Sequence, residues 1–197
     1  MTVAKHVLRY LKGTKHLVLT YMRACTTQDT QDMWSLLYGY ADANWGTDVN
    51  SHRSRTGYVF YFAGAPIAWK SQLQASTALS SAEAEYMALC SAVKEAVYLR
   101  MVLCEIGFTP ILDLPTLIYE DNQGCIAMAG DPVKHGRTKH IDIRFHYIWD
   151  MILAGEIFVI YCPTEEMIAD VLTKSLNGDK FDQMVEWLGL QAAMDTV

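Results

Sequence analysis

The chain has 197 residues, of which 51% are apolar and 19% charged, a composition typical of a globular protein with a sizeable core. A formal net charge of −6 argues against a simple non-specific nucleic-acid binder, so contact with a polyanion would need a local basic patch. The five cysteines are scattered without zinc-ligand spacing, which favours a reducing compartment over a structural zinc site. We see no signal peptide, lipidation motif or apolar run of about 18 residues, so we expect a soluble, intracellular protein without a membrane partner.

The first 33 residues differ in pattern from the rest of the chain. Residues 4–12 have helical spacing, and residues 16–22 resemble a short strand. Residues 23–33 are polar and rich in Thr and Gln, with no apolar period, so they predict a linker with a domain boundary near residue 33.

After residue 33, predicted strands and helices alternate. Strands are predicted at 35–43, 56–63, 66–70, 115–121 and 155–162, and the sequence AGAP predicts a tight hairpin turn between the second and third. Helices are predicted at 81–106, 122–130, 140–154, 164–176 and 178–190. This order predicts an α/β protein in which a mixed sheet carries helices on both faces.

Two aspartates stand at the carboxyl ends of predicted strands. Asp42 has the same strand parity as Tyr38 and Tyr40, and Asp121 ends the fourth strand. Acids at strand ends are well placed for a functional site. For Asp121 alone, an N-cap of the helix that follows is an equally good explanation.

The helix at 81–106 carries two acids that we assign to different roles. Ser80 and Glu83 have the spacing of a capping box, which gives Glu83 a structural role. Glu85 instead falls on the apolar stripe that should pack on the sheet, where an acid is unfavourable unless something pairs with it. A functional role is therefore favoured for Glu85.

A fourth acid, Asp170, lies on the flank of a predicted buried helical stripe. Taken alone, it is better explained as a residue on a solvated helix face than as a functional one. Carboxylates gathered in one partly buried site repel one another, and divalent cations such as Mg²⁺ relieve the repulsion. Two such ions about 4 Å apart can promote in-line phosphoryl displacement. The four acids together therefore predict a metal site for this chemistry.

Six blocks, in the order of a known family, resemble the ribonuclease H domain of copia-type LTR retrotransposon Pol polyproteins: GYADANW, SRTGYVFYFAGAPIAWKS, SSAEAEYMAL, YEDNQGCI, RTKHIDIRFHYI and TEEMIADVLTKSL. The resemblance covers residues 34–176, and residues 1–22 resemble the C-terminal end of the adjoining reverse transcriptase. It implies a ribonuclease-H-like fold with a mixed five-stranded sheet flanked by helices. The implied domains are a reverse transcriptase remnant plus linker (1–33), a ribonuclease H-like domain (34–177) and a helical tail (178–197).

The family also implies hydrolysis of the RNA strand of an RNA–DNA hybrid at a D-E-D-D site. Matched motif by motif, the ligands of two Mg²⁺ ions, or Mn²⁺ in their place, are Asp42, Glu85, Asp121 and Asp170. The implied partners are the hybrid and other parts of a Pol polyprotein, in a cytoplasmic particle or the nucleus. The stretch CPTEEMIAD, which ends at Asp170, lacks the histidine that cellular ribonucleases H often carry just before the last aspartate; this bears on product release rather than activity. The paired-aspartate polymerase motif is absent, so no polymerase activity is expected from this chain.

Basic residues form two candidate contacts for the substrate backbone. One is a cluster in the C-terminal half: Lys134, His135, Arg137, Lys139, His140, Arg144 and His146. The other comprises Arg53, Arg55 and Lys70. Contacts to phosphates position a duplex without reading its sequence. For each residue singly, a solvated surface position is the simpler explanation.

Two alternatives compete with this interpretation. The first is an integrase-type transferase, which would use Asp42, Asp121 and Glu156. The glutamate of such a site is expected on a helix, whereas Glu156 begins a predicted strand, and Glu85 would be left without a role. The second is a catalytically silent retrotransposon fragment that binds nucleic acid or protein. The presence of all four acids argues against that reading.

Overall fold

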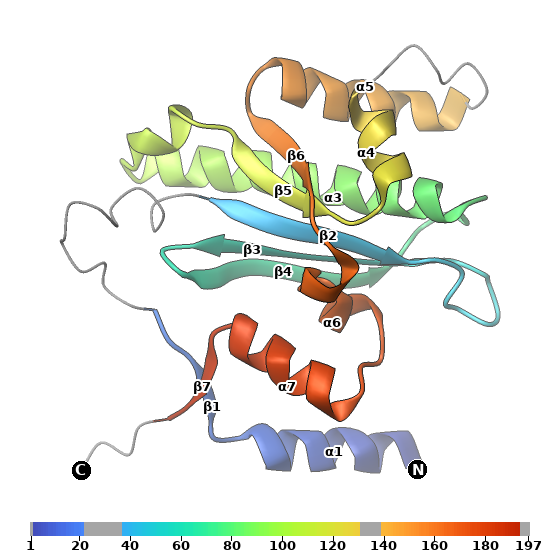
Figure 1. The fold of residues 1–197 in the computed structure, drawn as a ribbon, viewed down its shortest axis with the longest axis vertical. Coiled ribbons are helices and arrows are strands. Elements are labelled where there is room, and N and C mark those ends of the chain that lie inside the picture. The colour runs from blue at the N-terminus through green and yellow to red at the C-terminus, as the bar shows by residue number, and fades with distance from the viewer. Residues whose placement is uncertain (1, 22–36, 131–138, 194–197) are drawn as a thin grey trace.

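The computed structural model describes residues 2–21, 37–130 and 139–193, and its centre is a five-stranded sheet (Figure 1). The strand order is β4-β3-β2-β5-β6, in which β3 is antiparallel to β2 and β4, and β2, β5 and β6 are parallel. The strands are β2 (Tyr38–Asn44), β3 (Arg55–Phe62), β4 (Ala65–Leu73), β5 (Thr116–Glu120) and β6 (Ile157–Tyr161). The predicted α/β class and mixed sheet are confirmed.

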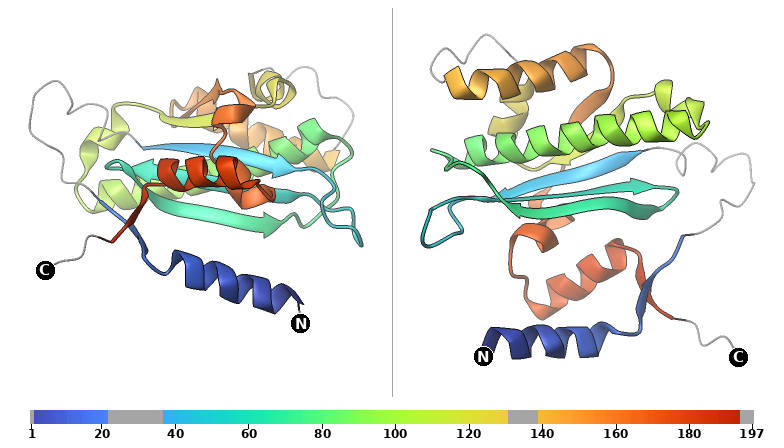
Figure 2. Two further views of the ribbon diagram at one scale, coloured as in Figure 1. Left: turned by 60° about the horizontal axis from the view of Figure 1, so that its bottom comes forward. Right: turned by 180° about the vertical axis from the view of Figure 1, so that it is seen from behind.

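Helices cover both faces of the sheet. On one face lie α3 (Ser81–Glu105), α4 (Gln123–Gly130) and α5 (Lys139–Leu153), and on the other lie α6 (Asp170–Thr173) and α7 (Gly178–Trp187) (Figures 1 and 2). Two 3₁₀ turns, Thr109–Leu112 and Thr164–Glu166, precede β5 and α6. Within the described ranges, no helix is both long and apolar enough to cross a membrane.

The N-terminal segment lies beside the C-terminal one. Helix α1 (Thr2–Thr14) leads into β1 (Leu17–Leu19), which pairs antiparallel with β7 (Leu190–Ala192) (Figure 1). The rings of Tyr10 and Phe181 meet edge to face, and the Tyr21 hydroxyl donates to the Pro66 carbonyl. The predicted boundary near residue 33 lies outside the described residues, so the division into three segments stays a prediction.

The predicted hairpin between β3 and β4 is present. Its two connecting residues, Ala63 and Gly64, have φ angles of 53° and 78°. Two consecutive positive φ angles match the twist of the flanking strands, and glycine adopts that conformation without steric penalty. Strand β4 then runs to Leu73, three residues beyond the predicted end.

The predicted helix at 164–176 is wrong. The chain forms a 3₁₀ turn at Thr164–Glu166, becomes extended at Met167 (φ −71°, ψ 95°) and forms helix only at Asp170–Thr173. Met167, Ile168 and Ala169 are all buried, in two different clusters. A single amphipathic helix buries one face, so burial of consecutive side chains requires the irregular backbone.

The core of the α3 face contains the stripe predicted from the sequence. Its members are all buried: Ala88, Leu89, Ala92, Ala96, Leu99 and Leu103. All but Ala88 share one cluster with Leu37, which directly precedes β2, and with Ala41 of β2. Tyr38 and Tyr40 pack on the opposite face with Tyr61 and Tyr119. Both faces around β2 are therefore filled, which fixes the strand that carries Asp42.

Candidate metal centre

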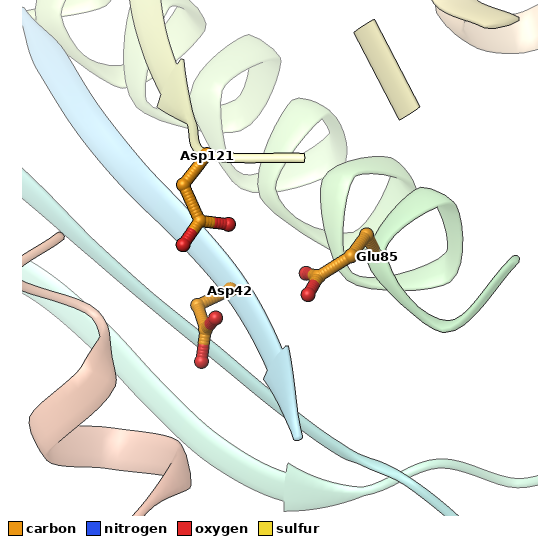
Figure 3. Close-up of side chains that lie close together, drawn as sticks. All are labelled: Asp42, Glu85 and Asp121. Atoms are coloured by element: carbon orange, nitrogen blue, oxygen red, sulfur yellow. The ribbon is translucent and has the colours of Figure 1, made fainter. Parts of the chain in front are cut away.

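Three of the predicted acids meet at one edge of the sheet. Asp42 lies in β2, Asp121 follows the last residue of β5, and Glu85 lies near the start of α3; one carboxylate oxygen from each lies within 4.8 Å of the other two (Figure 3). Strands β2 and β5 are parallel neighbours, so their carboxyl ends reach the same edge. Helix α3 begins beside that edge and supplies the third acid.

The start of α3 places Glu85 inward. Ser80 is the N-cap, and its hydroxyl accepts a hydrogen bond from the Glu83 N–H at 3.1 Å. The Glu83 carboxylate bonds back to the Leu79 N–H at 2.7 Å, one residue before the cap that we predicted as its partner. Glu83 therefore serves the helix terminus, while Glu85, two residues on, is 7% exposed and faces the sheet.

The N-cap explanation of Asp121 is wrong. The cap of α4 is Asn122, whose Oδ1 accepts a hydrogen bond from the Cys125 N–H at 2.9 Å. Because the neighbouring residue satisfies the helix terminus, the carboxylate of Asp121 is free to point toward Asp42 and Glu85 (Figure 3).

Burial and mutual repulsion disfavour the ionised form of these carboxyl groups and raise the pKa of Glu85 and Asp42. Burial, followed by the charges of Glu120, Asp42 and Asp121, raises the pKa of Glu85 to about 10, although a backbone hydrogen bond from Ala43 opposes the rise. Burial also raises the pKa of Asp42, against the lowering effects of Lys174 and Thr173. These are the shifts expected where several acids share a site without enough counter-charge.

The donor set fits a divalent cation. All three groups are carboxylates, the oxygen ligands that Mg²⁺ and Mn²⁺ accept. The buried Oε2 of Glu85 has no hydrogen-bond partner among residues 2–21, 37–130 and 139–193. A cation among these oxygens would therefore satisfy an otherwise unpaired acceptor and neutralise the repulsion.

Asp170 lies beside the triad but has different partners. Its side chain is 2% exposed, so the explanation as a solvated helix face is wrong. Its Oδ1 accepts from Lys174 Nζ at 2.5 Å and its Oδ2 from Lys180 Nζ at 2.7 Å. Lys174 Nζ also lies 3.1 Å from Asp42 Oδ1. The structure thus brings three predicted acids together directly and links the fourth to Asp42 through a lysine.

Our reading of the sequence missed four residues at this edge. Lys174 and Lys180 pair with Asp170, Thr173 donates a hydrogen bond to Asp42, and Glu120 is fully buried behind Asp121. The spacing of Asp170 and Lys174, four residues apart, is a helical ion-pair signal that could have identified Lys174. Lys180 comes from the next helix, so no local spacing could have indicated it.

The predicted substrate contacts are only partly described. Arg53 lies in the loop after β2, where its Nε donates to Ser51, and Arg55 begins β3 with NH1 3.5 Å from the Ser71 hydroxyl. Lys70 of β4 stands over the ring of Tyr58, 6.0 Å from its centroid. Of the other basic cluster, Lys134, His135 and Arg137 fall outside the described residues, and Lys139, His140, Arg144 and His146 lie on α5.

Glu156, the third acid of the rejected integrase-type reading, lies elsewhere. It directly precedes β6, at the opposite end of that strand from the triad, and its Oε2 accepts a hydrogen bond from the buried Arg100 at 2.6 Å. Its role is therefore accounted for by this ion pair.

Comparison with solved structures identifies the fold. A ribonuclease H1, LC11, isolated from compost by a metagenomic approach, superposes with a TM-score of 0.53 at 20% identity, covering 71% of this chain and 93% of that protein. The same enzyme in complex with an RNA/DNA hybrid gives a TM-score of 0.50 at 19% identity, covering 70% and 93%. The class of protein is thus defined: the chain has a ribonuclease-H-like fold.

Comparison with curated sequences identifies the relatives. The Pol polyprotein of transposon TNT 1-94 from Nicotiana tabacum is 36% identical over 188 residues, which is 95% of this chain and 13% of the polyprotein. That of transposon RE1 from Arabidopsis thaliana is 33% identical over 186 residues, 94% of this chain and 12% of the polyprotein. No protein-family model matches the sequence. As the motifs predicted, the chain is a homologue of one segment of the Pol polyproteins of copia-type retrotransposons, and it spans about an eighth of their length.

Proposed function

We propose that this chain is a metal-dependent ribonuclease H that hydrolyses the RNA strand of an RNA–DNA hybrid. The observation that carries the proposal is the convergence of Asp42, Glu85 and Asp121, with oxygens within 4.8 Å of one another, at the edge of a ribonuclease-H-like sheet. The relationship to Pol polyproteins and the hybrid bound by the LC11 enzyme support the choice of substrate. The same Pol context favours an intracellular location.

The proposed division of roles follows from burial and contacts. Asp42, Glu85 and Asp121 hold a divalent ion, and Asp170 joins Asp42 at a second position. When bound, such ions activate water and stabilise the charge that develops on the phosphate. Thr173 fixes the orientation of Asp42 by donating to its Oδ2, and the stacked rings of Tyr40 and Tyr119 hold the adjacent strands.

The direct test uses a hybrid with labelled RNA and purified protein in Mg²⁺ or Mn²⁺. We expect cleavage by the wild-type chain and a loss of at least about a hundredfold in kcat for Glu85→Gln and Asp121→Asn, because each removes a charged ligand from the ion. Glu83→Gln is the matched control, since this acid lies two residues from Glu85 and its carboxylate accepts a hydrogen bond at the helix terminus. Cleavage that survives in both ligand variants would refute the site assignment.

Asp170→Asn separates the second position from the first. We expect it to abolish cleavage while the ion held by Asp42, Glu85 and Asp121 still binds, because Asp170 is not a member of that group.

The wild-type chain itself distinguishes the enzyme from the alternative. If it binds hybrid but leaves the RNA intact in both Mg²⁺ and Mn²⁺, the catalytically silent binding domain is the correct description.

The two arginines near the β2–β3 loop are proposed to contact the substrate backbone. Arg53 and Arg55 are both partly exposed and lie near the end of β3 that pairs with the Asp42 end of β2. Charge removal at such positions weakens binding without touching chemistry. We expect Arg53→Ala and Arg55→Ala to raise KM and reduce its salt dependence, with kcat unchanged; an altered kcat at constant KM would contradict this role.

A further inference from the structure

The ammonium group of Lys174 lies between two buried carboxylates. Its Nζ is 3.1 Å from Asp42 Oδ1 and 2.5 Å from Asp170 Oδ1, and these side chains are 0% and 2% exposed. Lys174 itself is 32% exposed, so its stem reaches the pair from the solvent side. A single positive charge thus bridges the two acids that the proposed site would use for its second ion.

Every oxygen of these two carboxylates has a donor from the protein. Asp42 Oδ2 accepts from the Thr173 hydroxyl, and Asp170 Oδ2 accepts from Lys180 Nζ at 2.7 Å. The other half of the acid cluster differs, because in the described part of the chain neither Glu85 nor Asp121 forms an ion pair with a lysine or arginine. In the described part of the chain, the Asp170 side of the cluster therefore has counter-cations from the protein and the Glu85 side has none of its own.

A lysine ammonium and a divalent cation compete for the same oxygens. Both bind carboxylates at short range, and two cations in one position would repel strongly. Asp170 can ligate an ion only after Lys174 withdraws, and the partly exposed, flexible stem of this lysine allows that movement. The Glu85 side shares only Asp42 with this lysine, because Glu85 and Asp121 are not among its partners.

Building on the proposed function, we propose that Lys174 is an internal counter-cation that occupies the second of the two cation positions in the metal-free protein. It holds Asp42 and Asp170 together before metal binds, and it makes uptake of the second ion conditional on its own departure. The first ion binds at Asp42, Glu85 and Asp121, of which only Asp42 contacts Lys174, so it depends less on the departure of the lysine. Lys174 is in this sense a positioning residue that sets the order of metal binding.

Calorimetric titration with Mg²⁺ tests the order. The wild-type chain should bind one ion well and the second weakly, whereas Lys174→Gln should bind the second about tenfold more tightly, because a competing unit charge is gone. Lys174→Arg keeps the positive charge and should titrate like the wild type. Lys94→Gln is a charge-matched control on an exposed lysine of α3 that forms no ion pair with these acids.

Thermal unfolding with and without Mg²⁺ provides a second readout. In EDTA, Lys174→Gln should melt below the wild type, since two buried carboxylates lose their shared counter-charge, and Mg²⁺ should raise its Tm by more than it raises that of the wild type. A lysine with only a structural role would lower Tm equally under both conditions. That result, or an unchanged second affinity, or a variant unfolded even in Mg²⁺, would overturn the proposal.

The outcomes also distinguish this proposal from the proposed function. If Lys174→Gln titrates like the wild type while the wild-type chain binds Mg²⁺ and cleaves hybrid RNA, only the role of Lys174 fails. If the wild-type chain binds no Mg²⁺ and leaves the RNA intact, the proposed function fails, and the counter-cation role fails with it.

Discussion

Replacement of Glu85 by glutamine should stabilise the metal-free protein while abolishing its activity. Burial and neighbouring acids raise the pKa of Glu85 to about 10, from 4.5 for an ordinary glutamate. At pH 7 the carboxyl is therefore protonated in the folded chain and ionised in the unfolded chain. Folding must take up a proton there, and that uptake opposes stability.

The size and sign of the effect follow from this linkage. Below about pH 4.5 the group is protonated in both states and has no effect on stability. Between about pH 4.5 and 10 the folded chain keeps the proton while the unfolded chain loses it, so the free energy of unfolding falls as the pH rises. The penalty grows by about 1.4 kcal/mol per pH unit, which gives about 3 kcal/mol at pH 7. Glutamine has the same shape but does not ionise, so Glu85→Gln should raise the free energy of unfolding at pH 7 by that amount. For a chain of this size, each kcal/mol corresponds to roughly 2–4 °C in Tm.

Urea unfolding in EDTA at pH 5, 6, 7 and 8 measures the free energy of unfolding of both proteins. The advantage of Glu85→Gln should widen steadily across the series, whereas Glu83→Gln, which alters an acid bonded at the helix terminus, should show no such widening. Mg²⁺ should narrow the advantage, because the ion stabilises the ionised wild-type site. An advantage that is absent, or that does not change between pH 5 and 8, would refute the assignment of Glu85 as a buried acid without counter-charge.

Three further substitutions test how the site is held. Gly57→Ala would place a Cβ 2.6 Å from Thr173 Cγ2 of α6 and 3.1 Å from the Ala169 carbonyl oxygen. We therefore expect a loss of about 1–3 kcal/mol in the free energy of unfolding, measured with denaturant, together with weaker Mg²⁺ binding. Unchanged stability would show that α6 does not pack on β3 at this position. Ser80→Ala removes the acceptor for the Glu83 N–H and should lower stability by about 1 kcal/mol, with activity retained, so a change of kcat would contradict a purely capping role. Arg100→Met removes the donors to Glu156 and to the backbone carbonyl of Leu114. It should lower Tm through a loss of roughly 2 kcal/mol at unchanged Mg²⁺ affinity, and a neutral result would mean that these contacts contribute nothing to stability.

The sequence by itself determined the sheet, the long helix and three of the acids. Helical spacing on α3 separated Glu85 from Glu83, and the ends of the predicted strands identified Asp42 and Asp121. These features are local, because the period of the apolar residues and the position of a strand end are read from a few consecutive residues. The order of the motifs then gave the family, which the relatives confirm.

The tertiary structure alone decided the surroundings of Asp170 and the capping of α4. Sequence pattern predicted one helix across Asp170, but burial of Met167, Ile168 and Ala169 in two clusters breaks it. The same packing brings Lys180 from α7 to Asp170, and it places Lys174 between Asp170 and Asp42, which lies 132 residues before Lys174 in the chain. Asn122 rather than Asp121 caps α4, a choice between adjacent residues that depends on backbone geometry. Contacts between residues distant in the chain, and the backbone conformation that they impose, leave no periodic trace in the sequence, so only the folded arrangement shows that Lys174 also reaches Asp42 and that Lys180 reaches Asp170.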